Sequence, residues 1–131
     1  MDLTKITPDK ERTKSILKMV ELIEERIKLQ DKKKMAALIL SDYYEIIKEL
    51  LTALLLLDGY KTLSHKDLID YINLNYKEFT EHEISFMHNL RVMRNRIVYE
   101  GLFVENTYLE RNEKNIKNIV KKLKEVIKTK L

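Results

Sequence analysis

Residues that interrupt helices are nearly missing from this chain. Its 131 residues include two glycines, Gly59 and Gly101, and a single proline, Pro8. The commonest residues are Leu, Lys, Glu and Ile, which form helices or are well tolerated in them. Because such a chain offers few positions for the tight turns that a sheet requires, we predict an all-α fold.

Length and composition limit the class of protein further. The length fits a single domain that spans residues 1–131. Cysteine is absent, which excludes disulfides and thiolate metal sites and favours a cytoplasmic location. The N-terminal stretch MDLTKITPDKERTK is polar and lacks the apolar segment of a signal peptide. High Lys and Glu content with one glutamine is typical of proteins from heat-loving organisms.

The most apolar stretch, residues 35–57, contains four charged residues: Asp42, Glu45, Lys48 and Glu49. These charges predict a core helix and not a membrane span, so we expect no membrane association. The apolar residues of the stretch fall on more than one helical face: Leu38, Ile39, Ile46, Ile47, Leu50, Leu51, Leu54 and Leu55. We therefore predict a central helix that neighbours cover on two sides.

The first two helices are predicted from their caps. The first runs from Pro8 to Leu29, with Thr7 as its N-cap and the proline at the first helical position. Its apolar stripe consists of Ile16, Val20, Ile23 and Ile27. The second helix is capped by Asp31 and ends at Gly59, which suits the left-handed conformation that often follows a helix.

Three further helices begin with a Ser or Thr that is followed three residues later by an acid. These pairs are Ser64 with Asp67, Thr80 with Glu83, and Thr107 with Glu110. The third helix covers residues 64–75, the fourth ends at Gly101, and the fifth continues to the C-terminus. We predict a five-helix up-and-down type bundle.

Positive charge is concentrated in the last helix. Residues 111–131 hold eight Lys or Arg and two Glu, in a chain whose net charge is +4. The lysines at helical spacing are Lys114, Lys117, Lys121, Lys124 and Lys128, opposite Ile116, Val120, Leu123 and Ile127. The preferred interpretation is a solvated outer face, and the alternative is a track for a polyanion such as RNA. No aromatic residue is interleaved for base stacking.

The end of the fourth helix, RVMRNRIVYEG (91–101), is the most distinctive segment for function. Helical spacing predicts a core stripe of Phe86, Leu90, Met93 and Ile97, with His88, Arg91, Asn95 and Tyr99 on a different face. Arg94 lies at the border and Arg96 on the other flank. A guanidinium can bind two phosphate oxygens, and a neighbouring amide can orient a ribose hydroxyl. The simpler interpretation is that basic residues favour a helix C-terminus.

Two segments resemble the HEPN superfamily: YYEIIKELLTALLLLDGYKTLSHKDLIDYI (43–72) and LRVMRNRIVYEG (90–101). Members of that family are small helical bundles found beside minimal nucleotidyltransferases, in toxin–antitoxin pairs and in RNA-cleaving defence proteins. The resemblance implies a homodimer with a cleft between protomers. It also implies metal-independent RNA cleavage, in which a ribose 2′-hydroxyl attacks the adjacent phosphate, without a cofactor or metal.

The family motif is an arginine, usually followed by a polar residue, with a histidine four to six residues beyond. In this chain Arg94 matches the arginine, Asn95 the polar residue, and Tyr99 occupies the histidine position. Because a tyrosine with a pKa of about 10 is a poor general base, Tyr99 is expected to donate a hydrogen bond instead. The resemblance therefore predicts a module that is non-catalytic or weakly active.

Acids on the second helix and basic residues elsewhere complete the expected site. A partly buried acid needs a cation, so Glu45 or Glu49 is expected to pair with Arg94 or Arg91, and Asp42 shares their face. None of His65, His82 and His88 has a second histidine at metal-ligand spacing.

We predict a nucleotide- or RNA-associated module that acts with a minimal nucleotidyltransferase. Its expected phosphate or RNA contacts are Arg91, Arg94, Arg96, Lys117, Lys121 and Lys124. The alternatives are an endoribonuclease with an atypical Arg94–Asn95–Tyr99 site and a purely structural dimerisation module.

Overall fold

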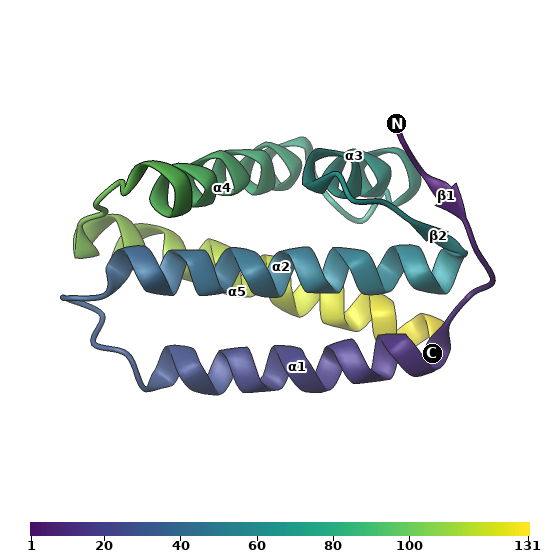
Figure 1. The fold of residues 1–131 in the computed structure, drawn as a ribbon, viewed down its shortest axis with the longest axis horizontal. Coiled ribbons are helices and arrows are strands. Elements are labelled where there is room, and N and C mark those ends of the chain that lie inside the picture. The colour runs from purple at the N-terminus through teal and green to yellow at the C-terminus, as the bar shows by residue number, and fades with distance from the viewer.

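The computed structural model describes all 131 residues and contains five helices and two short strands (Figure 1). The helices are α1 (Lys10–Lys28), α2 (Ala36–Asp58), α3 (His65–Asn75), α4 (Glu81–Glu100) and α5 (Asn106–Lys130). The predicted helical bundle is confirmed. The strands β1 (Thr4–Lys5) and β2 (Tyr60–Lys61) were not predicted, and they pair antiparallel in one two-stranded sheet.

Helix α2 is the centre of the molecule, as predicted. It packs against α1, α3, α4 and α5. The apolar residues expected on its several faces are fully buried except Leu38, which is 57% exposed. The predicted stripes of α1 and α5 are also buried, and every member belongs to the one hydrophobic core. Burial of this apolar surface is the main stabilising contribution to the fold.

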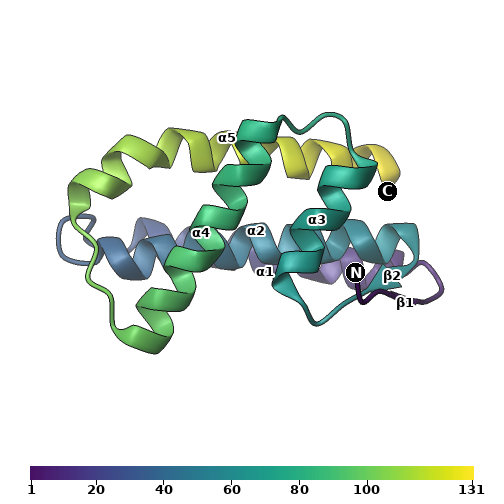
Figure 2. The same ribbon diagram turned by 90° about the horizontal axis from the view of Figure 1, so that it is seen from above.

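The helices do not follow a simple up-and-down order. Helices α1, α2 and α5 run alongside one another, whereas α3 and α4 lie across α2 as an antiparallel pair (Figure 2). Helix α4 begins beside α5, where Lys122 contacts Glu83. Helix α3 stays at the end of α2 because Tyr71, within it, and Tyr76, after it, both donate hydrogen bonds to Asp58. These contacts could not be read from helix lengths.

Three predicted N-caps are wrong, by two residues in α1 and α5 and by four in α2. Asp9 and not Thr7 caps α1, so Pro8 lies before the helix. Helix α2 begins at Ala36, because the Asp31 side chain accepts hydrogen bonds within a preceding turn, from the backbone N–H groups of Lys33 and Lys34. Helix α5 begins at Asn106, and Glu105 and not Thr107 occupies its N-cap position.

The other predicted boundaries are confirmed. Ser64 accepts a hydrogen bond from the Asp67 backbone, and Thr80 with Glu83 forms a complete capping box. Both glycines end helices with positive φ values, 87° at Gly59 and 67° at Gly101. The backbone of Gly59 also lies close to Ile6, the residue after β1, because a Cβ atom added at Gly59 would lie only 3.0 Å from the Ile6 carbonyl oxygen. No helix of the structure has the length and apolar character needed to cross a membrane.

Candidate phosphate-binding site

The inner face of α4 is not the face that its hydrophobic pattern predicted. Ile84, Met87 and Leu90 are buried, whereas Phe86, Met93 and Ile97 are only partly buried. Of the predicted core stripe, Leu90 alone is buried. Because residues three and four apart share a helix face, Arg91 and Arg94 continue the buried row toward the end of the helix. The long arginine stems can cover apolar surface while the guanidinium groups remain polar, and this permits arginines at these positions.

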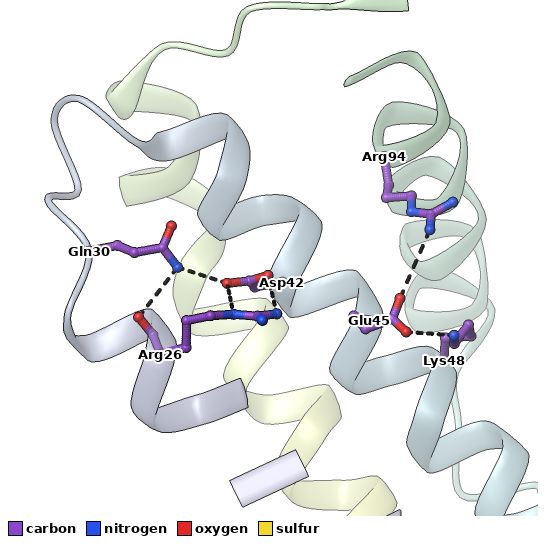
Figure 3. Close-up of polar contacts among 6 residues, drawn as sticks. All are labelled: Arg26, Gln30, Asp42, Glu45, Lys48 and Arg94. Carbon is purple, nitrogen blue, oxygen red and sulfur yellow. Dashed lines mark hydrogen bonds and ion pairs between the residues drawn. The ribbon is translucent and has the colours of Figure 1, made fainter. Parts of the chain in front are cut away.

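Arg94 reaches from α4 toward α2 (Figure 3). Its side chain is 18% exposed, and its Nη2 atom lies 4.0 Å from Glu45 Oε2, at the outer limit of an ion pair. Its Nη1 atom donates a hydrogen bond of 3.2 Å to Asn95 Oδ1, and its guanidinium carbon lies 5.9 Å from the centre of the Tyr44 ring. The expected pairing of Arg94 with Glu45 is therefore present, but it is loose.

Glu45 is already paired without Arg94. Its Oε1 atom lies 2.6 Å from Lys48 Nζ, and Lys48 also contacts Glu49 at 3.1 Å. The two carboxylates share one lysine, so Glu45 keeps a close cation without Arg94, although the three groups together retain one negative charge that faces the arginines. Arg91 forms no ion pair and no side-chain hydrogen bond at all. The region where α2 and α4 meet therefore holds two arginines whose donors are mostly free.

Three buried side-chain polar atoms in the chain lack a hydrogen-bond partner: Arg91 Nε, Arg94 Nε and Tyr44 Oη. All three belong to this one region, because the Arg94 guanidinium lies over the Tyr44 ring and both arginines act on the tyrosine electrostatically. Native structures rarely leave buried donors unpaired, since each one costs about 1–3 kcal/mol. The three unpaired atoms make this region the candidate for a site that binds an acceptor-rich ligand.

His65, the first residue of α3, lies at the same region. Its ring centre is 5.9 Å from that of Tyr44. Burial lowers the pKa of His65, and the positive charges of Lys48 and Arg94 lower it further. Burial also raises the pKa of Tyr44 to about 12 in spite of the nearby arginines. At neutral pH the imidazole is therefore neutral and the phenol keeps its proton.

Tyr44, Lys48 and His65 were missed as site residues in the sequence. Tyr44 carried one signal, because it shares the buried face of α2 with Ile47 and Leu51, where a hydroxyl group requires a partner. The position of His65 depends on how α3 packs on α2, and no local pattern predicts that.

The remaining residues predicted on α4 lie away from these buried atoms. Tyr99 is 76% exposed and has no hydrogen bond or ion pair, and Arg96 contacts only Glu100, at 3.8 Å. Asn95 is partly buried and accepts the hydrogen bond from Arg94. The structure brings Arg91, Arg94, Asn95 and Glu45 together, and it leaves Tyr99 at the surface.

The predicted lysines line a different part of the molecule. Lys117, Lys121 and Lys124 line a cleft between α1 and α5. Lys124 is paired with Glu24 of α1 at 2.7 Å. These lysines and the arginines of α4 therefore do not form one continuous basic surface on a single chain.

The acids of α2 contact basic and amide side chains. Asp42 accepts two hydrogen bonds from Arg26, at 3.0 and 2.8 Å, and one from Gln30, at 2.7 Å (Figure 3). Its partner therefore lies on α1 and not on α4. No group of three or more His, Asp or Glu side chains has an arrangement that could hold a metal ion.

Comparisons of the chain with protein-family models, with curated proteins and with solved structures gave no match.

Proposed function

We propose that the protein is an RNA- or nucleotide-binding module whose phosphate site is formed by Arg91, Arg94 and Tyr44. The observation that carries the proposal is the set of three buried, unpartnered polar atoms in one place. A phosphate oxygen can accept from both an arginine Nε and a neighbouring Nη atom, and a tyrosine hydroxyl can donate to a second oxygen. A bound phosphate would thus satisfy donors that the protein alone leaves unsatisfied.

The charge of the region favours an anion as the ligand. Arg91, Arg94 and Lys48 contribute three positive charges, while Glu45 and Glu49 contribute two negative charges that already contact the lysine. With His65 neutral, the net charge of the region is +1, because the two arginines contribute +2 and the group of Lys48, Glu45 and Glu49 contributes −1. Arginine is the residue best suited to a phosphodiester because its guanidinium is planar and always charged.

The proposal extends to the HEPN superfamily, on the segments quoted above. Within it the chain is a cytoplasmic homodimer that acts with a minimal nucleotidyltransferase, in a toxin–antitoxin-like pair. Three apolar or aromatic residues at the end of α4 support a partner on that side, because they are largely exposed: Val98 at 50%, Tyr99 at 76% and Phe103 at 74%. Large apolar side chains that lie exposed close together along the chain are candidates for an interaction surface.

Binding of a labelled single-stranded RNA, followed by fluorescence anisotropy over a range of salt concentrations, tests the phosphate site. Arg94→Met should weaken binding and reduce the slope of log affinity against log salt concentration by about one. Arg111→Met is the matched control, since Arg111 is exposed on α5 and forms no ion pair. Equal affinity and slope for wild type and Arg94→Met would reject the site.

The dimer has its own test. Light scattering at micromolar concentration should give twice the chain mass, and Tyr99→Lys should shift the mass toward the monomer because it puts a charge into the proposed contact. A monomer mass for the wild type would reject the shared-cleft part of the proposal, while the phosphate site of one chain would stand on the RNA data. A dimer without affinity for RNA or nucleotides would favour the purely structural module.

A metal-independent endoribonuclease is the second candidate, and the place of His65 favours it. In this reaction the ribose 2′-oxygen bonds to phosphorus, the bond from phosphorus to the 5′-oxygen breaks, and a proton moves from the attacking to the leaving oxygen. A neutral imidazole can accept the first proton, and an arginine can stabilise the charge on the phosphate. RNA cleavage in the presence of a chelator, lost in His65→Gln but kept in Tyr99→Phe, would establish this function.

A further inference from the structure

A second candidate site lies between α1 and α5. Both helices pack along α2, but they do not pack closely against each other. The space between them is a cleft of about 510 Å³. Its floor is apolar and is formed by Ile27 of α1, Tyr43 and Ile46 of α2, and Val120 of α5. The volume falls within the range of about 300–1,000 Å³ that is usual for small-molecule sites.

The rim of the cleft is strongly basic. Four of its lysines have no ion-pair partner: Lys28 on α1 and Lys117, Lys121 and Lys128 on α5. Two of its acids are already neutralised, since Glu24 contacts Lys124 at 2.7 Å and Glu113 contacts Lys32 at 2.8 Å. Glu125 is the one remaining carboxylate, and it is exposed. The unpaired groups of the rim therefore carry a clear excess of positive charge.

Three residues that line the cleft hold one another in a polar contact. Tyr43 donates a hydrogen bond of 2.7 Å to Glu113, whose other oxygen is held by Lys32. These two donors lower the pKa of Glu113 in spite of partial burial, whereas burial and the carboxylate raise the pKa of Tyr43. The tyrosine therefore remains a neutral donor committed to Glu113. It offers a ligand its ring and not its hydroxyl group.

We propose that this cleft binds an organic phosphate, a small molecule with an apolar or aromatic body that carries phosphate groups. The body would lie over the buried floor of Ile27, Ile46 and Val120 and against the aliphatic stems of the surrounding lysines, whose apolar surface it would remove from water. The phosphates would lie among the unpaired lysines, whose flexible ammonium groups contact phosphate as point charges. The cleft shares no residue with the Arg91–Arg94 site, so the inference does not rest on the proposed function.

Calorimetric titration with three probes tests the inference. Octyl phosphate and ATP carry an alkyl and an aromatic body, and tripolyphosphate carries charge without a body. At least one organic phosphate should bind with a Kd below about 1 mM, and at least about tenfold tighter than tripolyphosphate. The double variant Lys117→Gln/Lys121→Gln should weaken that binding by about tenfold. The matched control is Lys18→Gln/Lys114→Gln, because both of its lysines are exposed, unpaired and outside the cleft.

The outcomes separate the two sites. Binding that the cleft variant weakens and that Arg91→Met/Arg94→Met leaves unchanged supports the cleft. Binding lost only in the arginine variant assigns the ligand to the α4 site and overturns the inference. It is equally overturned if tripolyphosphate binds as tightly as the organic phosphates, or if none of the three binds below the millimolar range. Failure of the RNA experiment on Arg94 leaves this result intact.

Discussion

Replacing Arg94 with methionine should leave the stability of the protein nearly unchanged. Methionine keeps most of the side-chain length and apolar contact but removes the charge and every N–H donor. Ordinarily, breaking a buried ion pair costs about 3–5 kcal/mol, because the partner is left charged and alone. Here the partner is Glu45, which already contacts Lys48 at 2.6 Å and contacts Arg94 at only 4.0 Å.

The size of the change in the free energy of unfolding follows from the contacts that Arg94→Met removes. The loose pair with Glu45 contributes at most about 1 kcal/mol, and the guanidinium over the Tyr44 ring about 0.5–1 kcal/mol. Against these losses, the variant removes the buried, unpartnered Nε donor, which costs the wild type about 1–3 kcal/mol. The hydrogen bond from Arg94 to Asn95 is also lost, at a cost of about 0.5–1.5 kcal/mol. The gains and losses nearly cancel, so the free energy of unfolding should change by less than about 1.5 kcal/mol.

Urea unfolding followed by circular dichroism measures this change, with Arg26→Met as the comparison. Arg26 is more exposed than Arg94, yet it makes a two-pronged contact with Asp42. Its loss should cost about 1 kcal/mol, since Gln30 still donates to Asp42. Arg26→Met should therefore destabilise the protein more than Arg94→Met, although Arg26 is the more exposed of the two arginines. A loss of 3 kcal/mol or more in Arg94→Met would show that Arg94 closes a structural pair, and the argument for a free phosphate donor would fail.

Three further predictions concern Tyr99 at the position of the motif histidine, the partly buried imidazole of His65, and Asp58 at the end of α2. Wild-type protein should cleave RNA slowly or not at all, because Tyr99 lies away from the arginines of its own chain and is a poor general base. Acting across the proposed dimer cleft, Tyr99→His should raise metal-independent cleavage by up to roughly 10²–10⁴-fold; an unchanged rate in a folded dimer would mean that more than this residue is missing. Because the pKa of His65 is lowered, the unfolded chain takes up a proton first as pH falls below about 6.5. Wild type should therefore lose stability between about pH 7 and 5.5, and His65→Gln should lose less; parallel urea midpoints would contradict this. Asp58→Ala should lower the free energy of unfolding by about 2–4 kcal/mol, because it leaves the hydroxyls of Tyr71 and Tyr76 unpaired, and the double change to phenylalanine at both tyrosines should recover part of that loss.

Local signals in the sequence were sufficient for the helix count and for most of the core. Apolar residues at spacings of three and four predicted the buried faces of α1 and α5, and the two glycines predicted where α2 and α4 end. The capping box of Thr80 with Glu83 was read correctly because both of its hydrogen bonds join residues three apart. Interactions of such short range are nearly independent of the rest of the fold.

The prediction of N-caps was wrong at the starts of α2 and α5. Asp31 does accept backbone hydrogen bonds, but these stabilise a turn before α2 and not its first helical residues. At the start of α5, Thr107 lies inside the helix, one residue past its first position. A polar residue before an apolar run marks the neighbourhood of a helix start, whereas packing sets the exact residue.

The candidate site shows most clearly the difference between what local sequence patterns predict and what tertiary packing decides. From the sequence alone, Arg94 and Asn95 were identified as adjacent on one helix, and Glu45 as an acid that needs a cation. The crossing of α4 over α2 decided that the face of Met87 and Arg91 points inward, although the pattern of Phe86 to Ile97 had indicated another face. Tertiary packing also placed Tyr44 and His65 beside these arginines and left Tyr99 at the surface. Hydrophobic periodicity indicates how much of a helix can be buried. Which polar side chains are buried along with the apolar ones depends on the angle at which two helices cross. That angle is set by tertiary packing, so only the folded chain determines it.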